Sequence, residues 1–469
     1  MKKSQLINIL KTYSAKDIRE MRKWLLSPAH NQRQDVIQLF EFFFDDNHLS
    51  KEDYLEKPLV FSWIYPKETY DDAKMRQVMF FLLKNIEDFL TFQEIQEDEV
   101  NMKTILSSVY RKRKLNKLFE KNIKLSGQIQ QKSIIQNEKF YRNEYQLQLE
   151  KYTYLSSLNQ LSQNIQEVSN TLDISFLAGK LRQYCLMLSH QSVYQKEYTI
   201  GLLQTLLPII QTEPYIRTPA IAIYFYIYKT LTEKENQSHF FQLKEQIREH
   251  GHFFPHGEIR DIYLMAINYC IRKMNAGAEI FIREAFELYK LGFEKKVLIE
   301  NNLLTRASFH NVVSIALKLK EFKWVKNFVA DYQQFLEEKH RQGFVYYSLA
   351  RLYYEEKDYN QAMKLLIQEA HYDDIIINLS AKTLLAKMYY EQEEIDVLES
   401  LLESMRTYIQ RKKVMGYHKN NYKNIIRYTK KLLKITPYSK LTKEKLYGEI
   451  SQVSPLTEKK WLLTQLSKI

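Results

Sequence analysis

Small and large apolar residues alternate at a fixed spacing between Tyr346 and Leu366. The small residues are Ala350 and Ala362, and the polar segment 355–358 lies between them. The large residues beside them are Tyr346, Leu349, Tyr353, Tyr359 and Leu366. In an antiparallel helix pair, small side chains stand where the helices cross closely, and large side chains fill the space beside the crossing. The spacing therefore predicts a helical hairpin that turns at residues 355–358.

The same frame occurs on both sides of this hairpin. Thirty-six residues later it gives Leu385, Ala386, Tyr389, Ile395, Leu398 and Leu402, and thirty-seven residues earlier it gives Val312, Val313, Ala316, Phe322, Val325 and Val329. Further upstream the frame degrades, and Ala178, Ala222 and Ala266 mark longer, irregular units. Regular self-similarity predicts a stack of helical hairpins. A compact helical bundle, which also has small residues at its crossings, is the alternative.

Over residues 310–405 this spacing resembles the tetratricopeptide repeat family. The resemblance implies an irregular α-solenoid with an extended concave surface that holds a peptide or protein partner. The packing residues that it assigns are Leu349, Ala350, Tyr353, Tyr359, Ala362, Leu385, Ala386 and Tyr389. The chain departs from the family pattern at Lys357, where glycine is preferred, and at Asp374, where a closing proline is common.

The scarcity of glycine and proline predicts an all-α fold. The 469 residues include ten glycines and nine prolines, and no proline occurs between Pro66 and Pro208 or between Pro255 and Pro437. Long stretches without these residues favour long helices. A chain of this length also exceeds one simple core and suggests two or three cooperative units.

We divide the chain into four segments by composition and pattern. They are an N-terminal helical unit, 1–92; long polar helices, 93–170; tetratricopeptide-like repeats, 171–405; and a basic C-terminal helical cap, 406–469. The first segment fits a capping unit for the array, or a helix-turn-helix module as the alternative. In the last segment, we expect a terminal helix whose Trp461, Leu462 and Leu466 face the last hairpin.

Positive charge is concentrated in two places. The chain has a net charge of +13. The segment Arg406–Leu446 contains thirteen basic residues and one acidic residue, and Lys103–Lys124 contains eight basic residues and one acidic residue. Tyrosines interleave with the lysines of the first segment, and aromatic rings beside cations suit single-stranded nucleic acid. Its candidate anion-binding residues are Lys412, Lys413, Lys430 and Lys431. The alternative is an amphipathic helix whose tyrosines pack inward and whose lysines are solvated.

No motif points to catalysis or to a cofactor. His250, His252 and His256 are close in sequence, but they lie in a glycine- and proline-containing stretch that we read as a loop with little preorganisation for a metal. Cys185 and Cys270 lie in apolar helical patterns typical of buried free thiols, which suits a reducing compartment. We expect no metal, no cofactor, no membrane partner and a cytoplasmic location.

These observations favour a non-enzymatic protein-interaction scaffold built on a helical-repeat array. Its partner would be a protein or peptide that the sequence does not identify. The alternative is a helical protein that binds nucleic acid through the basic segment 406–446, and this alternative requires both basic clusters to share one face.

Overall fold

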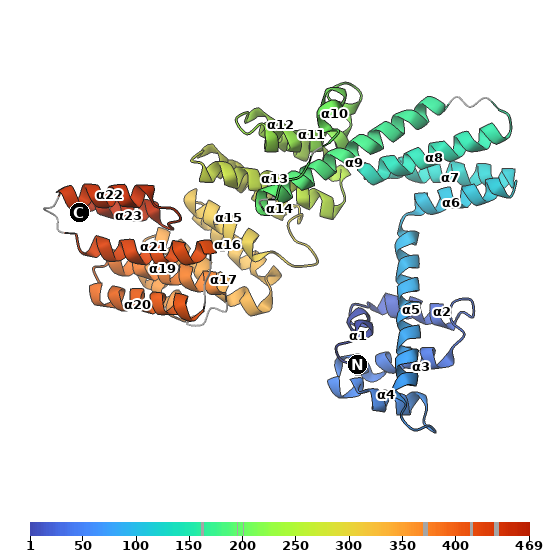
Figure 1. Cartoon of the computed structure of the whole chain (residues 1–469), viewed down its shortest axis with the longest axis horizontal. Coiled ribbons are helices and arrows are strands. Elements are labelled where there is room, and N and C mark those ends of the chain that lie inside the picture. Colours follow the sequence, from blue (N-terminus) through green and yellow to red (C-terminus); the bar gives the residue numbers. More distant parts are fainter. Residues whose placement is uncertain (161–163, 195, 200, 369–373, 413–415, 436–439) are drawn as a thin grey trace. The chain divides into compact units, whose positions relative to one another are not determined.

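The chain folds entirely into helices. The computed structural model describes residues 1–160, 164–194, 196–199, 201–368, 374–412, 416–435 and 440–469. These residues form 23 α-helices with a few short 3-10 helices (Figure 1). None of them belongs to a β-strand, although an isolated bridge joins Glu300 to Leu303. The all-α prediction is confirmed. No helix among these residues is long and apolar enough to cross a membrane.

Two compact units divide the chain, Met1–Phe176 and Leu177–Ile469. We call them unit 1 and unit 2. The four segments proposed from the sequence are a finer division and remain a prediction. The helices that begin in unit 1 are α1 Gln5–Leu10, α2 Ala15–Leu26, α3 Gln34–Phe44, η1 Asp45–Ser50, η2 Glu52–Leu55, α4 Lys57–Ile64, α5 Asp72–Glu97, α6 Glu99–Lys112, α7 Asn116–Lys132, α8 Glu138–Ser157 and α9 Ile165–Tyr194.

Unit 1 has two separate cores. In the first, α5 buries Met75, Val78, Leu82, Ile86 and Phe89, which recur at spacings of three and four and pack with the buried side chains of α1–α4. The second core is smaller and lies among α6, α7 and α8, which contact one another. Its centre combines stacked aromatic rings with buried amide and hydroxyl groups.

Unit 2 contains the predicted repeats. Its further helices are α10 Leu203–Ile210, η3 Tyr215–Arg217, α11 Pro219–Thr232, α12 Ser238–His250, η4 Gly251–Phe253, α13 His256–Asn275, α14 Ile280–Glu294, α15 Arg306–Lys318, α16 Phe322–Tyr332, η5 Gln333–Phe335, α17 Glu338–Glu355, α18 Tyr359–Gln368, α19 Ile375–Glu391, α20 Ile395–Arg411, α21 Gly416–Leu433, α22 Lys440–Gln452 and α23 Lys459–Lys468.

Consecutive helices of unit 2 pack as pairs. The pairs are α11 with α12, α13 with α14, α15 with α16, α17 with α18, and α19 with α20 (Figure 1). The first helices of neighbouring pairs also touch, since α17 contacts both α15 and α19, and α19 contacts α21. The hairpin predicted from Tyr346–Leu366 is the pair α17–α18, and its turn begins one residue later than expected.

The small residues of the repeat frame are buried. Ala350 on α17 and Ala362 on α18 have no solvent-exposed surface, and Ala316 and Ala386 in the neighbouring pairs are also buried. Without a larger side chain in the way, the two backbones of a pair can approach closely. That these alanines form the crossing of each hairpin remains a prediction.

The turns of three consecutive hairpins share one backbone conformation. Lys320, Lys357 and Glu393 have positive φ angles of 59°, 67° and 61°. Such a left-handed residue commonly ends a helix, and glycine adopts the conformation most easily. Lys357 therefore takes the conformation for which the tetratricopeptide pattern prefers glycine, at a cost of about 1 kcal/mol. The departure seen in the sequence changes the residue and leaves the turn intact.

We expect Ala350→Leu and Ala362→Leu each to lower the free energy of unfolding by about 1–3 kcal/mol, because the added atoms overpack a close crossing. Urea unfolding followed by circular dichroism measures the change. Lys364→Leu is the matched control, since Lys364 is exposed on α18, and it should change stability by less than about 0.5 kcal/mol. Unchanged midpoints for both alanine variants would contradict the assigned register.

Candidate functional site

A polar cavity of about 550 Å³ lies along the first helices of the last hairpins. We call it the inner cavity. Helices α15, α17, α19 and α21 contribute to its wall, and α23 covers part of it. The side chains central to its chemistry are Ser314, Tyr347, Arg351, Tyr354, Ser380, Thr383, Lys387, Glu391, Tyr422, Trp461 and Gln465. Cations from helix ends and from α23 add to this lining: Lys318, Lys320, Lys357, Lys460 and Lys468.

Equivalent positions of successive hairpins meet in this cavity. Ser314, Arg351 and Lys387 are separated by the same 37 and 36 residues that relate the hairpins. A guanidinium nitrogen of Arg351 donates to Ser314 Oγ at 2.6 Å. Arg351 also lies 5.7 Å from the centre of the Tyr347 ring. The cavity therefore presents one repeated surface, which is formed by a different polar side chain in each hairpin.

A histidine beside Arg351 is held neutral. The ring of His310 on α15 stacks against Tyr347 with 5.9 Å between ring centres. Burial lowers the pKa of His310 to about 3, and the positive charge of Arg351 acts in the same direction. At neutral pH, His310 therefore adds no positive charge to this wall of the cavity.

Glu391, the last residue of α19, links its own helix to three others, α17, α18 and α23, through hydrogen bonds. Its Oε1 accepts from Tyr354 Oη at 2.7 Å, from Trp461 Nε1 at 2.7 Å and from Gln465 Nε2 at 3.2 Å, and its Oε2 accepts from Tyr359 Oη. Burial alone would raise the pKa of Glu391, but the hydrogen bonds from Tyr354, Tyr359 and Trp461 outweigh burial and hold the pKa below its ordinary value. The carboxylate is thus ionised, and both of its oxygens accept hydrogen bonds.

Glu458, the residue before α23, supplies a second carboxylate to the cavity. It forms an ion pair with Lys387 Nζ at 2.8 Å. The same ammonium lies 4.5 Å from the centre of the Tyr354 ring. Lys387 is buried, so the carboxylate and the ring replace the water that a buried cation loses.

Cations outnumber carboxylates in the inner cavity. Seven basic side chains line it, against Glu355, Glu391 and Glu458. The last two carboxylates are already bound, as described above. Among the described residues, no carboxylate lies within ion-pair distance of five of the cations, which are Lys318, Lys320, Arg351, Lys460 and Lys468. The cavity therefore holds an excess of positive charge.

None of the packing residues predicted from the sequence lines this cavity. Ala350, Ala362, Leu385 and Ala386 are buried. The other four are half-buried: Leu349, Tyr353, Tyr359 and Tyr389. The cavity-lining residues were missed, although one signal marks three of them. Each of the three directly follows the second residue of the repeat frame: Ser314 follows Val313, Arg351 follows Ala350, and Lys387 follows Ala386.

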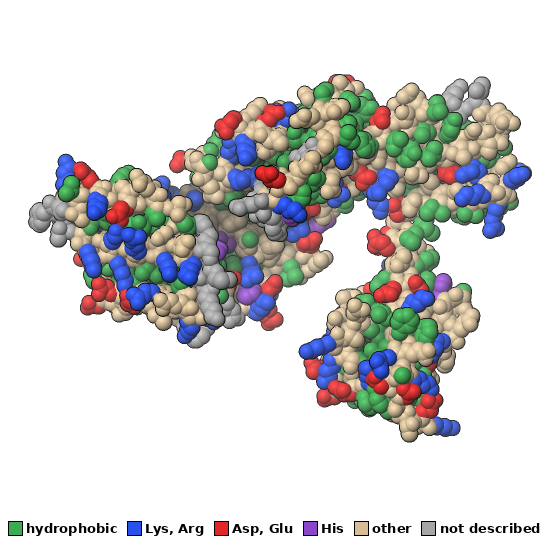
Figure 2. All heavy atoms as spheres, viewed as in Figure 1, with side chains coloured by type: hydrophobic (Ala, Val, Ile, Leu, Met, Phe, Trp, Pro, Cys, Tyr) green, Lys and Arg blue, Asp and Glu red, His purple; other side chains and the backbone are tan. Residues whose placement is uncertain are grey.

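The basic segment has a more ordinary structure than its composition suggests. Tyr408, Tyr422 and Tyr428 are buried, so their rings are not open to stacking. The exposed residues Lys419, Lys423 and Arg427 follow one face of α21, and the exposed Lys434 comes directly after its last residue. Figure 2 shows Lys and Arg side chains gathered over this helix. The second basic cluster lies on α6 and α7 in unit 1, whereas α21 belongs to unit 2.

The four predicted anion-binding lysines differ in their surroundings. Lys412 is exposed, and Lys413 lies outside the described residues. Lys430 pairs with Glu403, and Lys431 pairs with Glu449. The predicted lysine set therefore contains two cations that already have carboxylate partners.

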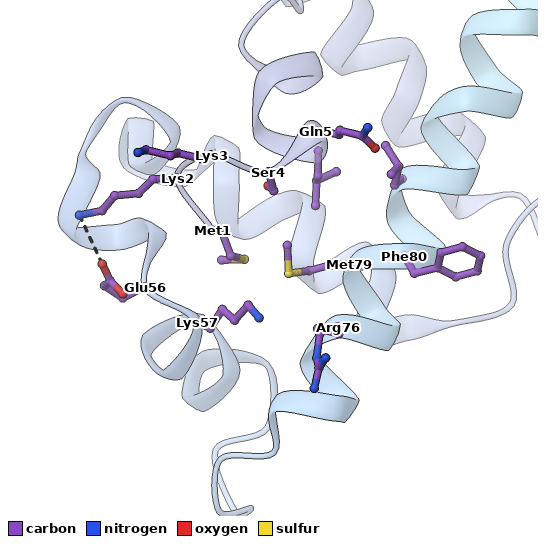
Figure 3. Close-up of a pocket in the computed structure, with 12 residues that line it drawn as sticks. Met1, Lys2, Lys3, Ser4, Gln5, Glu56, Lys57, Arg76, Met79 and Phe80 are labelled. Carbon is purple, nitrogen blue, oxygen red and sulfur yellow. Dashed lines mark ion pairs between the residues drawn. The ribbon is translucent and has the colours of Figure 1, made fainter.

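Two further cavities occur in unit 1. One, of about 680 Å³, lies at the N-terminus, where Met1 and Met79 point inward beside Lys2, Lys57 and Arg76 (Figure 3). These three cations pair with nearby carboxylates. The other, of about 890 Å³, lies along α7 and α8 above their stacked aromatic rings. Neither brings repeat-equivalent residues together.

The histidines singled out in the sequence do not converge. His250 ends α12, His256 begins α13, and His252 lies between them in η4. His256 Nε2 lies 3.1 Å from the carbonyl oxygen of Lys296. Within the described part of the chain, no group of three or more histidine, cysteine, aspartate or glutamate side chains is placed to hold a metal ion. Cys185 and Cys270 are both free and buried.

We expect Glu391→Gln to lower the free energy of unfolding at pH 7 by about 1–3 kcal/mol, because four donors lose their charged acceptor. The folded-state pKa of Glu391 is depressed. Its contribution is therefore complete above the unfolded-state pKa of about 4.3 and is lost as pH falls through the folded-state value. Urea unfolding at pH 7 and below pH 4 should show a shrinking difference from wild type.

The exposed Glu399 on α20 offers the matched control. Glu399→Gln should leave stability within about 0.5 kcal/mol of wild type at both pH values. A loss in Glu391→Gln that is the same at both pH values would contradict the role assigned to the ionised carboxylate.

Comparison with known proteins finds no matching family model, no similar curated protein and no similar solved structure. The resemblance to tetratricopeptide repeats therefore stands on the paired helices and on their spacing in the sequence. The inner cavity and the charges that line it are the features from which a function can be argued.

Proposed function

We propose that this protein is a non-enzymatic interaction scaffold, in which an irregular tetratricopeptide-like α-solenoid binds a segment of a partner protein. The observation that carries the proposal is the meeting of Ser314, Arg351 and Lys387 in one cavity. These residues occupy equivalent positions of three hairpins. A surface that repeats from hairpin to hairpin suits a ligand that is itself a chain, because successive parts of the ligand meet successive hairpins.

The contacts of the polar side chains also support binding over catalysis. Glu391 is occupied by four hydrogen-bond donors, and Glu458 is paired with Lys387. His310 is held neutral by burial and by Arg351. A general acid or base needs a free proton-transfer position with a pKa near the working pH. These groups instead hold helices together, and a reducing compartment such as the cytoplasm would keep Cys185 and Cys270 free.

A selection of random peptides displayed on phage tests this proposal with the full chain as bait. We expect the recovered peptides to bind the wild-type chain in solution and to lose at least about tenfold in affinity for Ser380→Trp. The indole would fill the cavity that Ser380 lines. Ser400→Trp is the matched control, because Ser400 is exposed on α20 and does not line the cavity.

Circular dichroism and the unfolding midpoint would establish that both variants are folded. Peptides that bind wild type and Ser380→Trp equally would show that the inner cavity is not the binding surface. A selection that recovers no binding peptide would contradict the scaffold proposal itself.

A second candidate function is the binding of a nucleic acid through α21. The exposed Lys419, Lys423 and Arg427 favour it, because they recur along one face of α21, and the exposed Lys434 follows the end of this helix. Because Tyr408, Tyr422 and Tyr428 are buried, these three rings are not available for stacking, and such binding would rest on phosphate contacts. Phosphate contacts predict weak sequence preference and strong dependence on salt.

If α21 binds nucleic acid, changing Lys419, Lys423, Arg427 and Lys434 to glutamine should weaken binding and flatten its salt dependence between about 50 and about 200 mM salt. Changing Lys412, Lys413, Lys430 and Lys431 should have a smaller effect, because two of these cations already have carboxylate partners. Fluorescence anisotropy with single-stranded and duplex oligonucleotides measures both. Absence of binding to either oligonucleotide at physiological salt would exclude this function.

A further inference from the structure

We propose that the inner cavity recognises an acidic segment of the partner protein and that Arg351 receives one of its carboxylates. The inference rests on the proposed function and names the chemistry of its ligand. Arg351 is half-buried in the wall of the cavity. Its polar contact is the hydroxyl of Ser314, and no carboxylate of the described residues pairs with it. Its remaining N–H donors can therefore bind a carboxylate in the two-pronged geometry that arginine favours.

The chain already contains one example of this recognition. Lys387 is the residue equivalent to Arg351 in the next hairpin, and it holds the carboxylate of Glu458 at 2.8 Å. Glu458 comes from the segment that leads into α23, far from Lys387 in the sequence. An acidic side chain brought from outside the hairpins is thus the ligand of this position in one hairpin. At the equivalent position of the preceding hairpin, Arg351 supplies the cation, and no carboxylate of the described residues pairs with it.

The surroundings of Arg351 favour a ligand with more than one negative charge. Lys318 and Lys320 lie at the end of α15, and Lys460 and Lys468 face the cavity from α23. None of these four lysines has an ion-pair partner among the described carboxylates. All four are exposed, and cations gathered around a concave surface raise the local concentration of anions. Helix α23 therefore covers part of the cavity and also completes its positive charge.

The spacing of the helices fits an extended chain. Packed helices lie about 8–10 Å apart, and an extended chain advances about 3.3 Å per residue. A segment crossing from one first helix to the next therefore uses about three residues. Acidic residues separated by two or three positions would meet Arg351 and the lysines on either side in turn. The hydroxyl groups of Ser380 and Thr383 also line the cavity and lie on the neighbouring helix α19.

Three fluorescein-labelled pools of short peptides test the proposal. In each pool half of the positions are random, and the others are fixed as aspartate and glutamate, as asparagine and glutamine, or as lysine and arginine. Titrations of the full chain should show binding of the acidic pool at least about tenfold tighter than of the other two. The affinity for the acidic pool should fall as salt rises from about 50 to about 200 mM.

Charge reversal locates the site. Arg351→Glu should lose at least about tenfold in affinity for the acidic pool and should gain affinity for the basic pool. Lys364→Glu is the matched control, because it makes the same charge change on the exposed face of α18, away from the cavity, and it should bind like wild type. Arg351→Gln removes the charge but keeps a side chain that can hydrogen-bond to Ser314. It therefore controls for a folding defect in Arg351→Glu, and it should also lose binding of the acidic pool.

Three outcomes would overturn the inference. The first is equal binding of the acidic and amide pools, and the second is acidic-pool binding that Arg351→Glu leaves unchanged. The third is loss of acidic-pool binding when Lys419, Lys423, Arg427 and Lys434 are changed to glutamine, which would move the site to α21. If phage selection yields peptides that need Ser380 but no acid, the scaffold function stands and this inference fails. If neither the selection nor any pool binds, both fail.

Discussion

The pairing of consecutive helices is the constraint on which the architecture of unit 2 depends. Ala350 and Ala362 are fully buried, and the crossing predicted at these residues would let the contacting helices α17 and α18 pack closely. Each residue added along an α-helix turns the direction of its side chain by about 100°. Once the alanine faces its partner helix, the direction of Arg351 is therefore determined. The near-constant step between hairpins repeats this direction and brings Ser314 and Lys387 to the same surface.

Covering this polar surface requires hydrogen bonds, and Glu391 concentrates them. A buried carboxylate is unfavourable unless it is paired or hydrogen-bonded. Tyr354 and Tyr359 satisfy it from the hairpin before, while Trp461 and Gln465 satisfy it from α23. The terminal helix also buries Leu462 and Leu466 in the core that includes α19, α20 and α21. One carboxylate on α19 thus couples the preceding hairpin, α17–α18, to helix α23.

The sequence predicted the hairpins because helix packing imposes a period on apolar residues. It also predicted that Trp461, Leu462 and Leu466 face the last hairpin; Trp461 does contact Glu391 and Tyr390 of α19, and Leu462 and Leu466 are buried in the core cluster that includes residues of α19 and α20. The cavity was not predicted, because a polar surface imposes no such period. Ser314, Arg351 and Lys387 occupy equivalent positions, but their side chains differ in chemistry, so no repeated residue type marks the surface. No local pattern marks Glu391 either, because its four hydrogen-bond donors come from residues distant in the sequence.

Net charge alone does not locate the proposed anion-binding site. The basic segment holds most of the excess, yet its buried tyrosines serve the core, and Lys430 and Lys431 have carboxylate partners. The inner cavity holds fewer cations, but Arg351 is half-buried there without a carboxylate. An interaction between charges strengthens as water is excluded. A single unpaired guanidinium in a concave wall can therefore select an acidic ligand more sharply than a row of solvated lysines on a helix.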